Sequence, residues 1–535
     1  MSEEHTSKQG LAALRPRSQP RVPLADLINT AATVDVGGIT ADSRLVQPGD
    51  LYVALPGAAQ HGASFVSDAL ASGAVAVLTD ETGRGLITRD GVDAQIAKTG
   101  VPVFAGAGGT VQVVADPRSE MAGLAARIYG CPADALKMFA VTGTNGKTTT
   151  TFLLDAALRA AGHRVGVVGT VGFLLNGRPL AAVRNTVTTP ESPELQALLG
   201  YLREAGADSV AMEVSSHALV LGRVDAIHFD VAAFTNFGRD HLDFHHDEES
   251  YFEAKASLFS PERTRHAVVN VDDPRGRQLV DRIRRAGVVG LTTISLDDRA
   301  ADCLVTEVEQ LADGRLRMVA RLAAREVDFV LSLPGEFNVR NALTAVAMLD
   351  AAGVDLDRAV ASLAEAAVPG RMQRIDLGPD APRVYVDFAH TPQAVAAALG
   401  VLPARRRIAV LGCGGDRDPD KRGPMGAAAA SAADVVIITD DNPRNEEPGA
   451  IRAQVRAGAE AARRAGDRAI EVIDGGDRRG AIRQALALAE PGDAIALLGK
   501  GHETGQEIRG GQVLPFDDAE VVAEEWANHR GRGTR

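Results

Sequence analysis

From about residue 135 to its end, the chain alternates short apolar or β-branched runs with longer amphipathic segments rich in Ala, Leu and Arg. This alternation predicts βαβ units and parallel sheets. No internal repeat of about 20–50 residues accompanies it. The strands predicted in this part are Met138–Val141, Val165–Val168, Ser209–Glu213, Val231–Thr235, Ala267–Val271, Val384–Val386, Ile408–Leu411, Val435–Thr439 and Ile495–Leu498.

Breaks in the pattern divide the chain into four predicted parts. They are a flexible leader (1–22), a small N-terminal α/β domain (23–131), a central domain (135–368) and a C-terminal Rossmann-like α/β domain (369–535). The small domain holds apolar runs at Gly37–Arg44, Asp50–Leu55, Val75–Leu78 and Pro102–Phe104. A helical, Ala-rich run meets a proline–glycine break at Val368–Gly370, which predicts a domain boundary.

The composition agrees with a folded protein of several domains. The 535 residues exceed one ordinary core, and apolar (45%) and charged (24%) fractions are those of globular proteins. The longest apolar stretches, such as Ala342–Leu349, fall well short of the ~18 residues that a membrane span needs. Residues 1–22 lack the apolar segment of a secretory signal. Fibrous, membrane and secreted classes are therefore excluded.

Charge and cysteine usage narrow the setting. The chain has 57 basic and 70 acidic residues, a net charge of −13, which argues against bulk nucleic-acid binding. A local basic pocket for a small anion remains open, because clefts focus their own field. Cys131, Cys303 and Cys413 lie far apart without CxxC spacing. That pattern favours a reducing cytoplasm and neither a disulfide framework nor a zinc site.

Most predicted strands of the central and C-terminal domains run directly into polar clusters. Ligands of open parallel sheets bind beyond the carboxyl ends of the strands. The pattern therefore predicts two ligand-bearing sheets that face a shared cleft. The clusters are Thr142-Gly143, Val214-Ser215, Asn236-Phe237, Gly412-Cys413, Asp440-Asp441 and Gly499-Lys500.

The segment Thr142–Thr149 reads TGTNGKTT and lies between a predicted strand and the helix-forming run Thr150–Ala161. Its glycines allow backbone N–H groups to surround phosphate oxygens at a helix N-terminus. In such a loop Lys147 reaches the β- and γ-phosphates, and the Thr148 hydroxyl can bind Mg²⁺. The general phosphate-loop pattern would require glycine where this chain has Val141. The alternative is a glycine turn with a solvated lysine, which the flanking strand and helix disfavour.

A second group of chemical residues follows the next strands. Glu213 ends a strand, where a nucleotide-bound Mg²⁺ finds its carboxylate. His217 follows it, and the segment Asn236–His245 contains two aspartates and two histidines. Each histidine taken singly is more often structural, but the group predicts metal or phosphate chemistry. Lys255, 14 residues after His241, reads as an ordinary helix lysine by periodicity.

Together these segments resemble the Mur ligase family, the ATP-dependent ligases that add amino acids to peptidoglycan precursors. The resemblance extends from about residue 37 to 517. It implies a central P-loop mononucleotide-binding domain between the two other domains. The shared segments are Thr142–Thr149, Glu213–His217, Asn236–His245, Lys255, Gly335–Asn338, Asp387–Pro392 and Gly412–Asp418.

Three segments resemble the diaminopimelate-adding branch of this family: Thr40–Arg44 with Gln47–Asp50, Asp441–Arg444 (DNPR), and Gly499–Glu503. The far end of diaminopimelate carries a carboxylate, which suits an arginine fork, and an ammonium, which suits carboxylates and carbonyls. A lysine acceptor has no such carboxylate. DNPR is also a plausible β-turn. The resemblance implies diaminopimelate contacts by Arg417, Asp441, Asn442, Pro443, Arg444, Gly499 and Glu503.

The resemblance also implies the remaining ligand contacts. Those to ATP are Gly143, Thr144, Asn145, Gly146, Lys147, Thr148, Thr149, Asn338, Arg371 and Asp387. Those to the UDP-MurNAc-dipeptide are Ala41, Ser43, Ala58, Ala59, Gln60, Thr188, Thr189, Ser215 and Arg223. The implied metal ligands are Thr148, Glu213, His241 and Lys255, the last as a carbamylated lysine (N6-carboxylysine). Leu221 stands where some relatives have glutamine, and His390 follows the family pattern.

By resemblance the γ-carboxylate of UDP-MurNAc-L-Ala-D-Glu attacks ATP, and the amine of meso-diaminopimelate attacks the resulting acyl phosphate. The implied catalytic residues are Lys147, Lys255, His241 and Glu213. Two Mg²⁺ ions would neutralise the reacting anions. The reacting atoms must approach within about 3–3.5 Å, which predicts domain closure. We expect a cytoplasmic, monomeric enzyme of cell-wall biogenesis, cell shape and division, with no nucleic-acid or membrane partner.

Other interpretations stay open from the sequence. A ligase similar to folylpolyglutamate synthase would share the phosphate loop, but it would not need Asp42–Arg44 or DNPR. A nucleotide-dependent switch would need neither the Glu213, His241 and Lys255 group nor paired arginines in a third domain. A scaffold with an inactive site would not be expected to keep these motifs intact.

Overall fold

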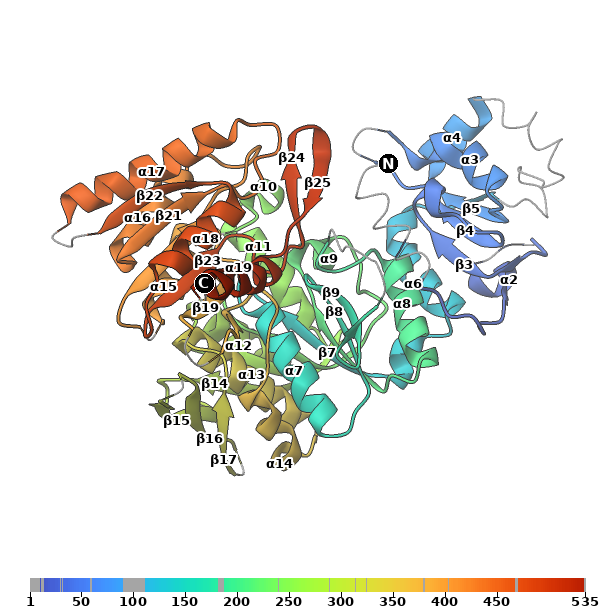
Figure 1. Ribbon diagram of the computed structural model, residues 1–535. Coiled ribbons are helices and arrows are strands. Elements are labelled where there is room, and N and C mark those ends of the chain that lie inside the picture. The colour runs from blue at the N-terminus through green and yellow to red at the C-terminus, as the bar shows by residue number, and fades with distance from the viewer. Residues whose placement is uncertain are drawn as a thin grey trace. The chain divides into compact units, whose positions relative to one another are not determined.

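The computed structural model describes the chain except for residues 1–9, 11–13, 29, 31, 58–59, 90–110, 181–186, 239, 288, 313, 324, 379–380, 403, 467–469 and 534–535. Its contacts divide it into two compact units. Unit 1 comprises residues 1–306, 320–327 and 341–362, and unit 2 comprises 307–319, 328–340 and 363–535. Figure 1 shows the elements of both units, which we describe separately.

Unit 1 begins with a small α/β domain around a four-stranded parallel sheet in the order β3-β4-β5-β6. Leu51, Val53 and Leu78 of this sheet pack with Leu124 of α6 in one buried core. The strands are β3 (Gly38–Thr40), β4 (Asp50–Val53), β5 (Ala76–Thr79) and β6 (Val111–Val113), after a ladder of β1 (Val22–Pro23) with β2 (Asp35–Val36). The helices are α2 (Leu24–Leu27), η1 (Ser43–Leu45), η2 (Gly62–Phe65), α3 (Val66–Ala71), α4 (Glu81–Arg89) and α6 (Pro117–Ile128).

Three of the four predicted apolar runs of this domain overlap a strand, and the fourth, Pro102–Phe104, lies outside the described residues. Part of the expected leader is bonded to unit 1. The Arg15 guanidinium pairs with the buried carboxylate of Asp50, at 2.7 Å from Nη1 to Oδ1. The Arg17 and Ser18 backbone amides donate to Glu204 at 2.7 and 2.8 Å. The Arg15 side chain is largely buried, and a buried arginine requires a carboxylate partner. Asp50 provides that carboxylate from 35 residues further along the chain.

The central sheet belongs mostly to unit 1, although β15, β16 and β17 extend past that unit's residue limits. It is parallel from β8 through β11, β7, β12, β13 and β14 to β15, with β9 and β10 added antiparallel at one edge. Its inner strands are buried apolar runs because helices cover both faces of such sheets. The strands are β7 (Lys137–Thr142), β8 (Val165–Gly169), β9 (Gly172–Leu175), β10 (Arg178–Pro179), β11 (Ser209–Glu213), β12 (Phe229–Phe234), β13 (Thr264–Asn270), β14 (Gly290–Ser295), β15 (Cys303–Gln310), β16 (Leu316–Arg321) and β17 (Glu326–Leu331).

The helices of this region begin with local signals that the sequence carries. Asp273 caps α12 through the amides of Arg275 and Gly276, with Pro274 in the first turn, and Gly287 ends the helix with φ +70°. The helices are η3 (Pro132–Ala135), α7 (Lys147–Ala160), α8 (Ser192–Glu204), α9 (Ser216–Val220), α10 (Leu242–His245), α11 (Glu248–Ala256), η4 (Ser257–Phe259), α12 (Pro274–Ala286), α13 (Glu336–Ala351), α14 (Leu356–Ala359) and η5 (Val360–Ala364).

Unit 2 contains a six-stranded sheet in the order β18-β19-β23-β20-β21-β22, parallel except for β18. One buried core lies on each face of this sheet. The strands are β18 (Gln373–Ile375), β19 (Arg383–Asp387), β20 (Arg407–Leu411), β21 (Val435–Thr439), β22 (Glu471–Gly476) and β23 (Ala494–Leu498). The helices are α15 (Pro392–Gly400), α16 (Arg422–Ala432), α17 (Pro448–Ala465), α18 (Arg478–Leu488) and α19 (Asp518–Gly533), and η6 (Arg509–Gly511) joins the hairpin strands β24 (Gly505–Ile508) and β25 (Gln512–Pro515).

The predicted α/β class with parallel sheets is confirmed. All nine strands predicted after residue 135 are present, and Ser209–Glu213 and Val435–Thr439 have the predicted bounds. No helix among the described residues combines the length and apolar composition that a membrane crossing requires. The shared cleft between the two sheets stays a prediction.

Candidate active site

The phosphate loop lies between β7 and α7, as predicted, and two of its glycines cannot be replaced without strain. Gly143 has φ +145°, and a Cβ there would lie 2.0 Å from Thr235 Oγ1. Gly146 has φ +88°, and a Cβ there would lie 2.4 Å from Asn341 Oδ1. Both backbone conformations favour glycine. Thr235 and Asn341 therefore shape the loop, although the sequence reasoning assigned them no role.

Asn236, in the segment after β12, bonds to this loop through both its side chain and its backbone. The Asn145 amide donates to Asn236 Oδ1 at 2.9 Å, and Thr144 N donates to Asn236 O at 3.0 Å. The Lys147 ammonium donates to the carbonyl oxygens of Gly143 and Thr144 at 2.8 and 2.9 Å. The loop thus places a lysine and the N-terminus of a 14-residue helix at one point, an arrangement that suits phosphate.

Glu213 ends β11 with its carboxylate against the first turn of α7. The Thr148 hydroxyl lies 3.0 Å from both Glu213 carboxylate oxygens. Thr170 also donates to them, from its amide at 2.8 Å and its hydroxyl at 3.1 Å. Glu213 is only 1% exposed. The donor set of one carboxylate and two hydroxyls fits a hard divalent cation such as Mg²⁺. Thr170 is an addition to the predicted residues.

Lys255 of α11 lies against the same loop, so the helix lysine of the sequence pattern is buried. Its Nζ donates to the Gly143 carbonyl at 2.9 Å and lies 4.5 Å from the centroid of the Tyr251 ring. The side chain is 1% exposed. Burial, reinforced by the charge of Lys147, lowers the pKa of Lys255 well below its ordinary value. Burial therefore shifts this amine toward its neutral form.

The histidines form an aromatic group next to α11. The His241 and His217 rings are 4.9 Å apart, and His217 and His245 are 5.5 Å apart. His245 Nε2 lies 2.8 Å from Ser216 Oγ. His241 has φ +52° and a side chain that is 48% exposed. In the part of the chain that the structure describes, no group of three or more His, Cys, Asp or Glu residues is arranged to hold a metal. The roles of His241 and Lys255 as ligands stay predictions.

Four residues predicted for the UDP-sugar-peptide gather around the end of β11. Thr189 Oγ1 donates to the Glu213 carbonyl at 2.9 Å and accepts from Ser215 N at 3.1 Å. Arg223 Nη1 donates to the Thr189 carbonyl at 3.0 Å. Thr188 and Thr170 hydroxyls are 3.1 Å apart. Two further contacts were not predicted: Glu191 pairs with Arg223 at 2.6 Å and with Arg118 at 3.3 Å.

The N-terminal residues of this predicted site lie in the small domain. Ser43 begins η1, next to Ala41 and to Asp42, whose side chain caps that turn through the Arg44 amide. Gln60 is exposed, while Ala58 and Ala59 lie outside the described residues. Their contacts with a nucleotide stay predictions.

In unit 2, the residues predicted for ATP have partners within the chain. Asn338 Nδ2 donates to the Pro334 carbonyl at 2.8 Å. Asp387 accepts from the amides of Met372 (2.7 Å) and Ala389 (2.9 Å). Burial raises the pKa of Asp387, and the charge of Arg371 opposes this shift. The His390 Nδ1 lies 2.8 Å from the Phe388 carbonyl.

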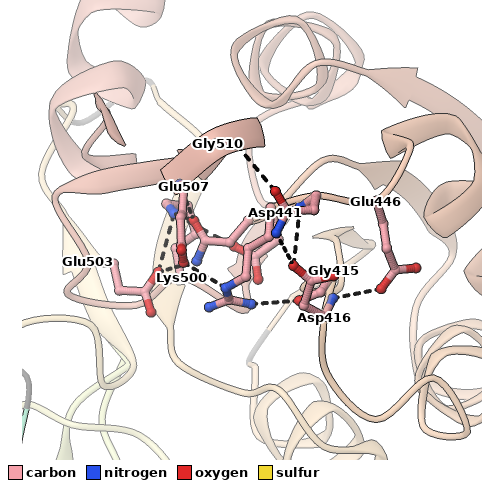
Figure 2. Close-up of polar contacts among 11 residues, drawn as sticks. Gly415, Asp416, Asp441, Glu446, Lys500, Glu503, Glu507 and Gly510 are labelled. Atoms are coloured by element: carbon pink, nitrogen blue, oxygen red, sulfur yellow. Dashed lines mark hydrogen bonds and ion pairs between the residues drawn. The ribbon is translucent and has the colours of Figure 1, made fainter. Parts of the chain in front are cut away.

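The two segments predicted for diaminopimelate meet in unit 2. Asn442 Nδ2 donates to Glu503 Oε2 at 2.8 Å, across 61 residues of sequence. The Lys500 ammonium, with no exposed surface, donates to Asn442 Oδ1 at 3.2 Å and to Glu503 Oε2 at 3.3 Å. Its Nζ lies 3.7 Å from Asp441 Oδ1. Figure 2 shows Lys500, Glu503 and Asp441 grouped in this way.

Arg444, the last residue of DNPR, is fixed by partners on both sides. Its Nε donates to Glu507 Oε2 at 2.6 Å, and its Nη1 donates to the Gly415 carbonyl at 2.8 Å. A Cβ built on Gly414 would lie 3.0 Å from Arg444 Nη1 and 3.8 Å from Arg417 Cγ, so both arginines flank that glycine. Arg417 itself is exposed. The Glu507 contact was not predicted, because no family segment contains it.

Buried charged residues interact electrostatically with Asp441 of the DNPR segment. Arg478 and Asp518 are both fully buried and joined by two hydrogen bonds of 2.7 and 2.6 Å. Burial raises the pKa of Asp441, and the charges of Lys500 and Arg478 oppose the shift. Pairing in this way is what allows ionised groups inside a fold.

Comparison with known proteins gives consistent matches. Residues 35–129 match the model described as "Mur ligase family, catalytic domain", 141–349 the Mur ligase middle domain, and 370–501 the Mur ligase glutamate ligase domain. A protein of Streptomyces avermitilis named UDP-N-acetylmuramoyl-L-alanyl-D-glutamate–2,6-diaminopimelate ligase is 45% identical over 95% of this chain and 97% of its own. A protein of the same name from Streptomyces coelicolor is 44% identical, covering 96% and 97%. A solved structure of a ligase with that name has a TM-score of 0.68 at 30% identity, covering 96% of this chain and 100% of that one.

Proposed function

Because this chain belongs to the Mur ligase family, we propose that it joins 2,6-diaminopimelate to UDP-N-acetylmuramoyl-L-alanyl-D-glutamate with cleavage of ATP to ADP and phosphate. It is then a ligase of peptidoglycan precursor synthesis, and its nucleotide-linked substrates suit the cytoplasm as its place of action.

One observation carries the choice of amino acid. The side chain of Asn442 bridges Glu503 and the Lys500 ammonium, so the DNPR segment and the segment 499–503 form one connected polar cluster. Arg444 and Arg417 flank Gly414 beside that cluster. Arginine guanidinium groups next to carboxylates suit the far end of diaminopimelate, which carries one carboxylate and one ammonium.

The phosphate loop supports ATP as the second substrate. The amides around Gly143–Lys147, the N-terminus of α7 and the Lys147 ammonium together suit the β- and γ-phosphates. When ATP binds, we expect Lys147 to exchange the carbonyl oxygens of Gly143 and Thr144 for phosphate oxygens, because charge-assisted bonds to an anion are stronger.

Thr148 and Glu213 would hold Mg²⁺, since their hydroxyl and carboxylate oxygens already lie within 3.0 Å of each other beside the loop. The bound cation would neutralise the charge that otherwise repels an anionic nucleophile. The deeply buried Lys255 would react with carbon dioxide as its neutral amine, giving the carbamate that the family resemblance implies. Burial favours that neutral form.

The reaction then has two steps. An oxygen of the D-glutamate γ-carboxylate bonds to the γ-phosphorus of ATP as the bond to ADP breaks, which gives an acyl phosphate. The diaminopimelate amine next attacks the acyl carbon, loses a proton, and expels phosphate through a tetrahedral intermediate. Lys147 would stabilise charge on the transferred phosphoryl group, and Arg444 and Arg417 would orient the amine from its far end.

The decisive experiment measures ADP release and the mass of the nucleotide product with UDP-MurNAc-L-Ala-D-Glu and three acceptors. With meso-diaminopimelate we expect ADP in equal amount to tripeptide product, and little of either with L-lysine or D-glutamate. Equal activity with L-lysine would contradict the proposed acceptor. No ADP release with any acceptor would contradict the ligase assignment.

A further inference from the structure

The hairpin β24–β25 lies directly after segment 499–503, and its first strand is bonded to the DNPR loop. Gln506 Nε2 donates to the Asp441 carbonyl at 2.6 Å, and the Glu507 amide donates to Asn442 Oδ1 at 2.9 Å. The Arg444 amide donates to the Glu507 carbonyl at 3.1 Å. Two successive residues of β24 therefore bond to the DNPR loop, and Figure 2 labels Glu507 and Asp441 in this cluster.

Arg444 adopts a left-handed backbone conformation, which is unfavourable for a residue with a Cβ. Its φ is +50°, in the left-handed region that costs a residue with a Cβ about 1–2 kcal/mol. In this conformation the Arg444 amide donates to the Glu507 carbonyl and its Nε donates to the Glu507 carboxylate. Glu507 therefore helps to hold the loop in the shape that presents the Arg444 side chain.

Two of the three guanidinium nitrogens of Arg444 donate hydrogen bonds to other residues of the chain. Nε donates to Glu507 and Nη1 donates to the Gly415 carbonyl. Within the described residues, Nη2 donates no hydrogen bond. The side chain of Arg444 is 18% exposed and that of Glu507 is 40% exposed. An incoming carboxylate can therefore bind at Nη2 while Glu507 keeps Nε.

We propose that Glu507 is a positioning residue for the amino-acid pocket: it orients the Arg444 guanidinium so that Nη2 faces the distal carboxylate of the acceptor. This inference rests on the proposed function, because it takes that acceptor to be diaminopimelate. Glu507 acts through Arg444, and its position is set by the bonds of its own strand to Asp441 and Asn442. Without these bonds, the Glu507 side chain would have no fixed position beside Arg444.

The opposite role for Glu507 is competition, in which its carboxylate occupies the place of the substrate carboxylate. The two roles predict opposite changes. Loss of an orienting partner raises the KM for diaminopimelate, whereas loss of a competitor lowers it. The bonds of Glu507 to Nε, and of its backbone to the DNPR loop, favour orientation.

The test uses the full-length enzyme and measures KM for meso-diaminopimelate, ATP and the UDP-dipeptide separately. We expect Glu507→Ala to raise the KM for diaminopimelate about tenfold and leave the other two within about twofold, since one charge-assisted bond is lost. Glu507→Gln, which keeps an acceptor oxygen, should recover part of this loss. An unchanged or lowered KM for diaminopimelate in both variants would overturn the proposal.

A double-mutant cycle separates this role from a general structural one. In the Arg444→Ala background, Glu507→Ala should cause no further rise in that KM, since coupled residues are not additive. Additive effects would overturn the proposal. Glu524→Gln is the matched control, because Glu524 also pairs with an arginine, Arg479, at 2.8 Å on unit 2, but on α19. Wild-type enzyme that makes no tripeptide product would instead reject the proposed function.

Discussion

The Thr148 hydroxyl lies 3.0 Å from each carboxylate oxygen of Glu213, so the first turn of α7 and the end of β11 meet at one pair of side chains. The Thr170 amide and hydroxyl complete this contact. Nothing in local sequence links the three residues, yet the parallel order β8-β11-β7 brings their strand ends together.

Replacing Glu213 by Gln should lower kcat for ligation by at least about 100-fold, since a metal that neutralises transferred phosphate is worth several kcal/mol. The amide can still accept from Thr148 and Thr170, so the fold should be retained. The measurement is ADP release against Mg²⁺ concentration, with circular dichroism as the check on folding. A variant with the wild-type Mg²⁺ dependence would remove Glu213 from the site.

Replacing Lys255 by Ala should abolish ligation, with partial recovery when short carboxylic acids are added. The buried position beside Gly143 would then be filled by a free carboxylate, in place of the proposed carbamate of Lys255. The measurement is tripeptide formation with and without formate or acetate. If Lys255→Ala keeps full activity, the lysine has no catalytic part.

Replacing Gly146 by Ala should raise the KM for ATP about tenfold or more. The new Cβ would lie 2.4 Å from Asn341 Oδ1 and would distort the phosphate loop. Gly162 offers a matched control because it too has a positive φ, +96°, but has no atom within 4 Å of its Cβ position. Gly162→Ala should therefore cost about 1 kcal/mol of stability and leave the KM for ATP unchanged. Equal KM values for both variants would mean that the loop tolerates a side chain.

Glu194 of α8 should make stability depend on pH. Burial raises its pKa to about 7 in the folded protein, from an ordinary value of 4.5. The folded state therefore holds a proton that the unfolded state releases, and stability falls as pH rises from 4.5 through 7. The loss should reach about 2 kcal/mol. One pKa unit corresponds to about 1.36 kcal/mol, and the total is reduced because Glu194 is only partly buried.

The measurement for Glu194 is the free energy of unfolding by urea between pH 5 and 8, for wild type and for Glu194→Gln. The amide cannot ionise, so this part of the pH dependence should disappear in the variant. Parallel curves for the two proteins would show that Glu194 titrates at its ordinary pKa.

The chain's local patterns were sufficient for much of the site. The strand ending at Glu213, the loop Gly143–Thr149 and the segment Asp441–Arg444 were all placed by hydrophobic runs that stop at polar residues. Such runs depend on near neighbours, because a buried parallel strand must be apolar on both faces and a phosphate loop must carry glycine where φ is positive. The predicted strand ends differ from the observed ones by a few residues, because pairing with the neighbouring strand sets the length of each strand.

Only the tertiary structure decided which side chains complete each site. Asn341 lies beside Gly146, Thr170 binds Glu213, and Glu507 orients Arg444, each across tens to hundreds of residues of sequence. It also decided that Lys255 is a buried amine, where periodicity gave an ordinary helix residue. The physical reason is that local sequence sets backbone preference and burial pattern. Hydrogen-bond partners, and the desolvation that shifts a pKa, arise only when distant strands and helices pack together.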